Sequence, residues 1–121
     1  MRIITLFFLV ASIIACNSDK LPKPIATDAC EVQQITYVGE IENIIVRTCA
    51  YDGCHSNGAA IGDYTSYDKL LSVLENGLFA TRVLDIGDMP PIYAPDDRPK
   101  SLTEEEVELI ECWFNTGFPE N

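Results

Sequence analysis

Apolar residues recur at helical spacing in three segments of the chain, and the stretches between them lack this period. The first segment follows Thr36, a residue type that caps helix N-termini, and it ends near Cys49. The second begins at Ser66 and stops at Gly77, because glycine commonly ends helices. Their apolar positions are Val38, Ile41, Ile44 and Ile45 in the first, and Tyr67, Leu70, Leu71 and Leu74 in the second. We therefore expect two helices that each bury one face.

The third segment carries the clearest helix signals. Thr103 and Glu106 have the spacing of a capping box, and acidic residues 104–106 would lie at the positive end of the helix dipole. The apolar positions are Val107, Ile110, Trp113 and Phe114, followed by Gly117 and Pro119, which end the helix. We interpret the acidic run as helix-capping charge and not as a general acid–base pair.

Between the second and third segments lies DIGDMPPIYAPDDRPKS, which contains four prolines. Proline is excluded from the interior of a regular helix and from central strands. A loop of this length in a small domain is either functional or disordered. We therefore treat its residues as candidates for a functional site.

The N-terminal stretch MRIITLFFLVASIIAC has one basic residue, Arg2, then an apolar run and a small residue before Cys16. This layout is typical of a signal peptide, and the end IIAC resembles the lipobox of bacterial lipoproteins. The run is short for a membrane span, which needs about 20 residues. We expect residues 1–15 to be a lipoprotein signal peptide and Cys16 to be lipidated, so that several acyl chains anchor the protein in a membrane. The alternative is an ordinary buried helix.

Residues 16–29 contain two prolines and little apolar periodicity, which predicts a lipidated tether. The folded domain is expected at residues 30–121. The formal net charge of −11 disfavours nucleic acid and anionic headgroups as partners, because both would be repelled. An exported lipoprotein would face the periplasm or lie at the cell surface.

The stretch RTCAYDGCHSNG contains Cys49, Cys54 and the chain's only histidine, His55, directly after the second cysteine. Two thiols can add to the vinyl groups of haem, and the adjacent imidazole can then bind the iron as proximal ligand. Tetrahedral zinc needs a fourth ligand, which would have to be Asp52 or Asp63. In an oxidising compartment the cysteines could instead form disulfides. We favour haem attachment because the histidine immediately follows a close cysteine pair.

A histidine-bound haem iron commonly takes a sixth ligand. Apart from Met1 the chain has one methionine, Met89, within the Pro-rich loop. A thioether opposite imidazole raises the reduction potential, which suits electron transfer. Methionine in a loop also serves as an apolar contact, and we favour ligation over packing because Pro90 and Pro91 restrict the loop.

The order of these features resembles that of small c-type cytochromes, most closely the planctomycete-type cytochrome c domains of exported bacterial lipoproteins. The resemblance covers about residues 35–119 and rests on IENIIVRTC, GCH, TSYDKLL, MPP and LTEEEVELIECWFNTGFP. One departure is the cysteine spacing: residues 50–53 separate the two cysteines, where the usual motif has two residues. This departure concerns whether both cysteines bond to the haem.

The resemblance implies a mainly α, cytochrome c-like fold of three to four helices around one haem, with the Pro-rich loop carrying the distal ligand. Cys49 and Cys54 would hold the haem covalently, and His55 and Met89 would be its axial ligands. Trp113 would match the aromatic residue that packs near the crossing of the first and last helices. The implied function is one-electron transfer with a redox partner protein outside the cytoplasm, as an electron carrier more than as an enzyme in its own right.

The resemblance also implies contact between the first and last helices. Cys30 lies just before the first helix and Cys112 lies within the last, so we expect a disulfide between them. In the chain-entropy model a bridge that closes so long a loop stabilises by up to roughly 4–5 kcal/mol.

Two other functions remain open from the sequence. A non-haem interaction lipoprotein would have two disulfides, Cys49 with Cys54 and Cys30 with Cys112. A haem protein in which Met89 does not bind would have a vacant iron position and could sense a gas or reduce peroxide. Hydrolysis by a Ser-His-Asp set is disfavoured because the chain's one histidine is in the cysteine motif, and the glycines form no phosphate-binding loop.

Overall fold

The computed structural model describes residue 30 and residues 34–121, and all regular secondary structure in this part of the chain is helical. The mainly α fold expected from the sequence is therefore confirmed for these residues. The predicted signal peptide, residues 1–15, and the tether, residues 16–29 with Cys16, lie outside the described residues. Within the described part, none of the helices has the length and apolar character to cross a membrane.

Six helical stretches follow one another in residues 34–121, and two of them are single π-helical turns. They are η1 (Tyr37–Ile41), α2 (Glu42–Thr48), α3 (Tyr67–Glu75), α4 (Leu78–Ala80), η2 (Thr81–Asp85) and α5 (Glu104–Asn115). The turn η1 continues directly into α2, and α4 continues directly into η2. The first of the three expected helices thus corresponds to η1 together with α2, and the last corresponds to α5.

Thr36 caps the first helix as expected, since its hydroxyl accepts a hydrogen bond from the Gly39 amide at 3.0 Å. Three of the four predicted apolar positions, Ile41, Ile44 and Ile45, are buried. The prediction was wrong for Val38, which is 54% exposed, and Tyr37 is buried in its place. The π-helical turn has more residues per turn than an α-helix, so the 3.6-residue period does not hold there.

The second helix begins after Ser66, and its side chains Leu70 and Leu74 are buried as predicted. It ends before Gly77, whose φ of +76° favours glycine. The sequence pattern does not predict that the chain resumes as a helix immediately afterwards. It does so as α4 and η2, and the buried Phe79 anchors this segment to the core.

Both hydrogen bonds of the predicted capping box are present at the start of α5. The Thr103 hydroxyl accepts from the Glu106 amide at 3.2 Å, and the Glu106 carboxylate accepts from the Thr103 amide at 2.9 Å. Glu106 also forms an ion pair with Arg47 of α2, so the start of α5 is tied to the first helix. Ile110 and Trp113 of α5 are fully buried.

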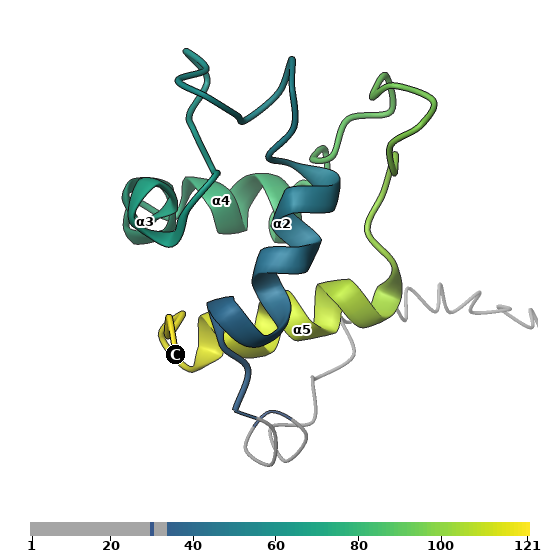
Figure 1. Ribbon diagram of the computed structural model, residues 1–121. Helices are drawn as coiled ribbons and strands as arrows, with labels where there is room; N and C mark the ends of the chain where they lie inside the picture. Colours follow the sequence, from purple (N-terminus) through teal and green to yellow (C-terminus); the bar gives the residue numbers. More distant parts are fainter. Residues whose placement is uncertain (1–29, 31–33) are drawn as a thin grey trace, which may run out of the picture.

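The first helix crosses α5 at one end of the molecule, and the C-terminal tail closes this crossing (Figure 1). The carbonyl of Pro119 accepts hydrogen bonds from the Tyr37 amide and from the Trp113 indole, each at 2.9 Å. The carbonyl of Phe118 accepts from the Tyr67 hydroxyl at 2.9 Å, which adds α3 to the same junction. Trp113 therefore lies where three helices meet the tail.

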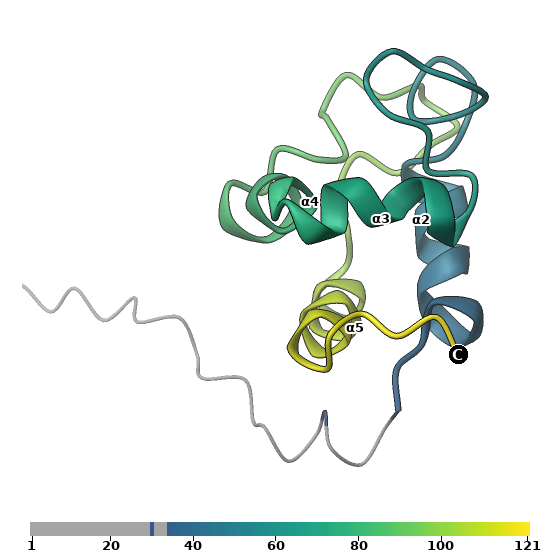
Figure 2. The same ribbon diagram turned by 90° about the vertical axis from the view of Figure 1, so that its left-hand side faces the viewer.

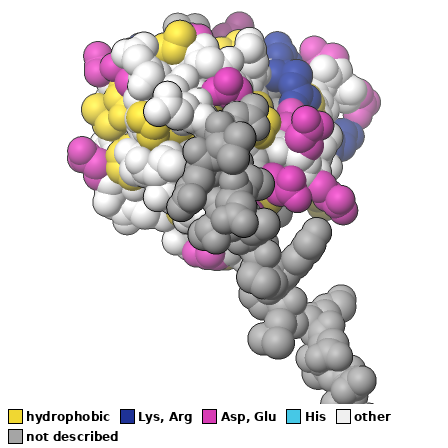
Figure 3. Space-filling view, turned by 90° about the horizontal axis from the view of Figure 1, so that it is seen from below, with side chains coloured by type: hydrophobic (Ala, Val, Ile, Leu, Met, Phe, Trp, Pro, Cys, Tyr) yellow, Lys and Arg dark blue, Asp and Glu magenta, His cyan; other side chains and the backbone are white. Residues whose placement is uncertain are grey.

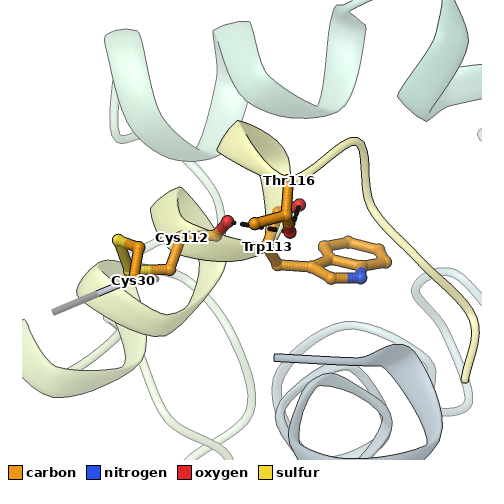
Figure 4. The surroundings of a disulfide bond; sticks show 4 residues. All are labelled: Cys30, Cys112, Trp113 and Thr116. Carbon is orange, nitrogen blue, oxygen red and sulfur yellow. Dashed lines mark hydrogen bonds between the residues drawn. A yellow bond between two sulfur atoms is a disulfide. The ribbon is translucent and has the colours of Figure 1, made fainter. Parts of the chain in front are cut away.

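Cys30 and Cys112 are joined at disulfide distance, as expected, with their Cα atoms 5.1 Å apart. Figure 4 shows the pair together with Trp113 of α5 and Thr116, the C-cap residue of this helix. The Thr116 hydroxyl donates to backbone carbonyls of the last turn of this helix. The disulfide thus attaches the residue that precedes the first helix to the buried part of the last.

Two loops, residues 49–66 and residues 86–103, rise at the end of the molecule opposite α5, and both views show them on the same side (Figures 1 and 2). The face seen from below shows acidic side chains spread over the surface, with the basic side chains confined to one edge (Figure 3). The sequence-predicted site residues lie on the two loops and on the end of α2 from which the first loop starts.

Candidate functional site

A cavity of about 350 Å³ lies between the two loops and the segment formed by α4 and η2. It is lined by all four side chains that the sequence predicts as haem-binding residues: Cys49, Cys54, His55 and Met89. Apolar side chains form much of the remaining wall, among them Ile61, Tyr64, Leu78, Phe79, Val83 and Pro90. Residues separated by 40 positions in the sequence thus face one enclosed space.

The four residues between the cysteines form a closed turn. The carbonyl of Cys49 accepts hydrogen bonds from the amides of Tyr51 and His55, at 3.1 and 3.0 Å, and the Cys54 amide donates to the Tyr51 carbonyl at 3.0 Å. Gly53 has a φ of +89°, a left-handed conformation that glycine adopts without strain. The turn accommodates the two residues beyond the usual spacing, and it brings the His55 amide within hydrogen-bond distance of the Cys49 carbonyl.

Two contacts orient the imidazole of His55. Its Nδ1 lies 3.2 Å from the carbonyl oxygen of Gly62, and its ring stacks on Tyr64 with centroids 3.9 Å apart and planes within 3°. In the neutral tautomer that donates from Nδ1, Nε2 is the nitrogen available for a metal. Burial lowers the pKa of His55, which favours this neutral form.

Gly62 is required for this arrangement. A Cβ added at this position would lie 3.0 Å from the Tyr64 ring and 3.7 Å from Nδ1 of His55. Its φ of +109° is also unfavourable for any other residue type. Gly62 and Tyr64 were not predicted from the sequence, because neither belongs to a motif and their role depends on contacts across the loop.

Asp63 holds the same loop closed. Its carboxylate accepts hydrogen bonds from the amides of Gly58 and Thr65, each at 3.0 Å, from the Thr65 hydroxyl at 2.6 Å and from Lys69 at 2.8 Å. The hydrogen bond from Lys69 is the largest cause that lowers the pKa of Asp63. Asp63, considered above as a zinc ligand, is therefore engaged in loop structure.

Both cysteines of the motif carry free thiols and are partly buried. Burial raises the pKa of Cys49 to about 11, so this thiol is neutral at physiological pH. The Thr48 hydroxyl lies 3.2 Å from its sulfur. A neutral thiol is a weak nucleophile, and the Cys49 side chain lines the cavity.

Two further residues of the cavity wall were not predicted. The Tyr51 hydroxyl is buried, and no described residue forms a hydrogen bond with it. Burial, followed by the neighbouring Cys54 thiol, raises the pKa of Tyr51 to about 12, and the Arg98 guanidinium lies 4.6 Å from its ring centroid. Arg82 also lines the cavity and donates from Nε to Asp88 at 2.7 Å.

The donor set fits a covalently attached haem. One imidazole, one thioether and two thiols line the same cavity, and its size falls in the range of about 300–1,000 Å³ that is usual for small-molecule sites. Within residue 30 and residues 34–121, no group of three or more His, Cys, Asp or Glu side chains is arranged to hold a metal ion by itself. The iron of a porphyrin needs fewer protein ligands, since the ring supplies the other four.

Comparison of the chain with protein-family models, with curated proteins and with solved structures finds no match. The chemistry of the cavity is therefore what carries a functional assignment.

Proposed function

We propose that this protein is a single-haem c-type cytochrome that transfers electrons outside the cytoplasm. A lipid anchor at Cys16 would hold it at a membrane. One observation carries the proposal: Cys49, Cys54 and His55 from one loop and Met89 from the other line one mainly apolar cavity. The bound haem would supply one-electron exchange at its iron. The partner would be another redox protein.

The chain's own residues have separable roles in this proposal. Cys49 and Cys54 would hold the haem through thioether bonds, and Gly62 would fix Nδ1 of His55 so that Nε2 binds the iron. Met89 would supply the second axial ligand. The apolar wall would exclude water, which together with the thioether favours the ferrous state.

The decisive experiment is production of the full chain together with a haem-attachment system. We expect a reduced-minus-oxidised absorption difference typical of c-type haem, and an intact mass after denaturation equal to the processed, lipidated polypeptide plus one haem. The Cys30→Ser/Cys112→Ser variant is the control, because it removes two cysteines that lie outside the cavity and should still carry haem. A wild-type mass without haem would refute the proposal.

Single substitutions resolve the role of each cysteine despite the long spacing. Cys49→Ser and Cys54→Ser should each retain haem through the remaining thioether bond, in lower yield, and the double variant should lose covalent haem altogether. Haem retention in full by Cys49→Ser, with an unchanged spectrum, would mean that only Cys54 is bonded. His55→Ala should lose the six-coordinate spectrum.

The axial role of Met89 is tested by Met89→Ala. The reduction potential should fall because a thioether ligand favours ferrous iron, and an unchanged potential would assign Met89 to packing alone. The lipid anchor has an independent test, in which Cys16→Ser abolishes incorporation of labelled fatty acid and releases the protein from the membrane fraction.

A further inference from the structure

The loop segment that carries Met89 separates two cavities. Val83, Met89, Pro90, Pro91 and Tyr93 line both the 350 Å³ cavity described above and a second one of about 420 Å³. The second lies between the Pro-rich loop and the start of α5, where Leu102 and Val107 form its opposite wall. Residues 88–93 are thus a wall with open space on both sides.

Few hydrogen bonds hold this wall in place, although Pro90 within it is buried. Arg82 donates from Nε to the Asp88 carboxylate at 2.7 Å, and the Asp88 amide donates to the Arg82 carbonyl at 3.1 Å. Within the described part of the chain, no other hydrogen bond joins residues 88–93 to any of the helices. Pro90 and Pro91 have no amide hydrogen to donate, and Ile92 and Tyr93 are 84% and 82% exposed.

We infer that the Arg82–Asp88 pair positions Met89, and that residues 88–93 can move as a wall toward the second cavity when this pair is lost. The inference rests on the proposed function, in which Met89 occupies the distal side of the haem. Movement of the wall would free that side for a small neutral donor molecule, such as imidazole. Arg82 would then be a positioning residue that acts through Asp88 and the adjoining methionine.

Because there is space behind the wall, two substitutions can be designed that should change the mobility of Met89 in opposite directions. Arg82→Gln keeps a polar side chain of similar length but removes the charge that holds Asp88. Val107→Phe places a larger side chain in the second cavity and leaves less space behind the wall. The first variant should loosen Met89 and the second should hold it more firmly.

The measurement is imidazole binding to the ferric haem protein, followed by its absorption spectrum. Arg82→Gln should bind imidazole about 2- to 5-fold more tightly than wild type, as expected for loss of one exposed ion pair. It should also weaken the charge-transfer band that a sulfur ligand gives ferric haem. Val107→Phe should bind imidazole more weakly than wild type.

Matched controls separate this effect from general loss of structure. Arg47→Gln removes another arginine ion pair, the one with Glu106, and Val46→Phe enlarges an exposed residue of α2 that lines neither cavity. Both should bind imidazole as wild type does. The exchanged pair Arg82→Asp/Asp88→Arg should restore wild-type affinity at least in part.

Equal imidazole affinity in wild type, Arg82→Gln and Val107→Phe, or a shift of both variants in the same direction, would overturn the inference. A second readout does not depend on haem. Hydrogen exchange of the Asp88 and Ala94 amides, which donate to the Arg82 and Pro91 carbonyls, should speed up in Arg82→Gln and slow down in Val107→Phe. If the wild-type protein carries no haem, the proposed function fails, and unchanged exchange rates would then refute the movable wall separately.

Discussion

At the crossing of the first helix with α5, the chain is closed by a disulfide, a fully buried tryptophan and hydrogen bonds from the C-terminal tail. At the opposite end, two loops enclose a cavity, and turns, one aspartate and one arginine pair hold them. The first end buries large side chains in regular structure. The second leaves thiols, an imidazole and a methionine facing open space.

This difference separates the residues that hold the fold together from the residues that face the cavity. A domain of this size buries a modest core, so the covalent bond and Trp113 contribute a large share of its stability. Loops on such a frame can hold reactive groups without supporting the fold. Substitutions of buried residues at the crossing should therefore lower the free energy of global unfolding by more than substitutions near the cavity.

Trp113→Ala should have the largest effect. The indole is fully buried and donates to the Pro119 carbonyl, so its removal should cost about 3–5 kcal/mol in the free energy of unfolding. Denaturant titration measures this cost. Tyr93→Ala, which truncates an exposed aromatic residue at the cavity end, should change it by less than about 0.5 kcal/mol. Comparable losses for the two variants would show that the helix crossing contributes no more to stability than the cavity end does.

Loss of the disulfide should come next. Cys30→Ser/Cys112→Ser opens a loop between residues 82 positions apart and should cost about 2–4 kcal/mol. The same titration, run with and without reductant, checks this value. Reductant should lower the wild-type stability to that of the variant and leave the variant itself unchanged. A wild-type protein insensitive to reductant would show that the bridge contributes nothing.

Gly62→Ala should lower the free energy of unfolding by about 1–2 kcal/mol, because it combines a left-handed backbone with a Cβ only 3.0 Å from Tyr64. Gly58→Ala is the matched control: its φ is +76° and an added Cβ meets no atom within 4 Å. Hydrogen exchange of the Tyr64 amide, which donates to the His55 carbonyl, should accelerate more in the first variant. Equal acceleration would mean that backbone strain alone matters.

Thr103→Ala should cost about 1 kcal/mol, since it removes the hydroxyl that accepts from the Glu106 amide. Ser66→Ala tests the same position at the start of α3, where the serine makes no side-chain capping bond, and should cost less. Thermal unfolding of the two variants side by side gives the difference. A larger loss for Ser66→Ala would contradict the cap geometry.

Asp63→Asn should have the smallest effect on global stability and a distinct pH dependence. The folded-state pKa of Asp63 is lowered, chiefly by Lys69, so the carboxylate stabilises the fold above about pH 4 and this contribution is lost as pH falls further. The variant should therefore differ from wild type at neutral pH and converge with it in acid. Asp68→Asn, whose carboxylate makes no hydrogen bond in the described structure, should run parallel to wild type.

Local sequence signals predicted the helices well where capping and periodicity agreed. The capping box at Thr103 and the cap at Thr36 are both present, and Ile110 and Trp113 are buried. Val38 was misassigned because a π-helical turn interrupts the α-helical period. The segment formed by α4 and η2 was missed because Gly77 ends one helix and directly precedes the next, which periodicity alone does not distinguish.

For the candidate site, the sequence identified the side chains with distinctive chemistry but not the residues that position them. Gly62, Tyr64 and Arg82 carry no motif, and their roles arise from contacts with His55 and with the Met89 loop. Such contacts depend on how two loops meet in space. Pairwise spacing along the chain holds no information about them.

The sequence by itself determined three of the helical segments, the adjacency of Cys54 and His55, and the irregular Pro-rich loop, because propensity, capping and proline geometry act between near neighbours. Only the tertiary structure decided that Met89 faces the same cavity as the cysteines, that the turn of residues 50–53 brings His55 back to Cys49, and that the Met89 segment has space on both sides. These features depend on the packing of distant segments, which the helix crossing and its disulfide set in place.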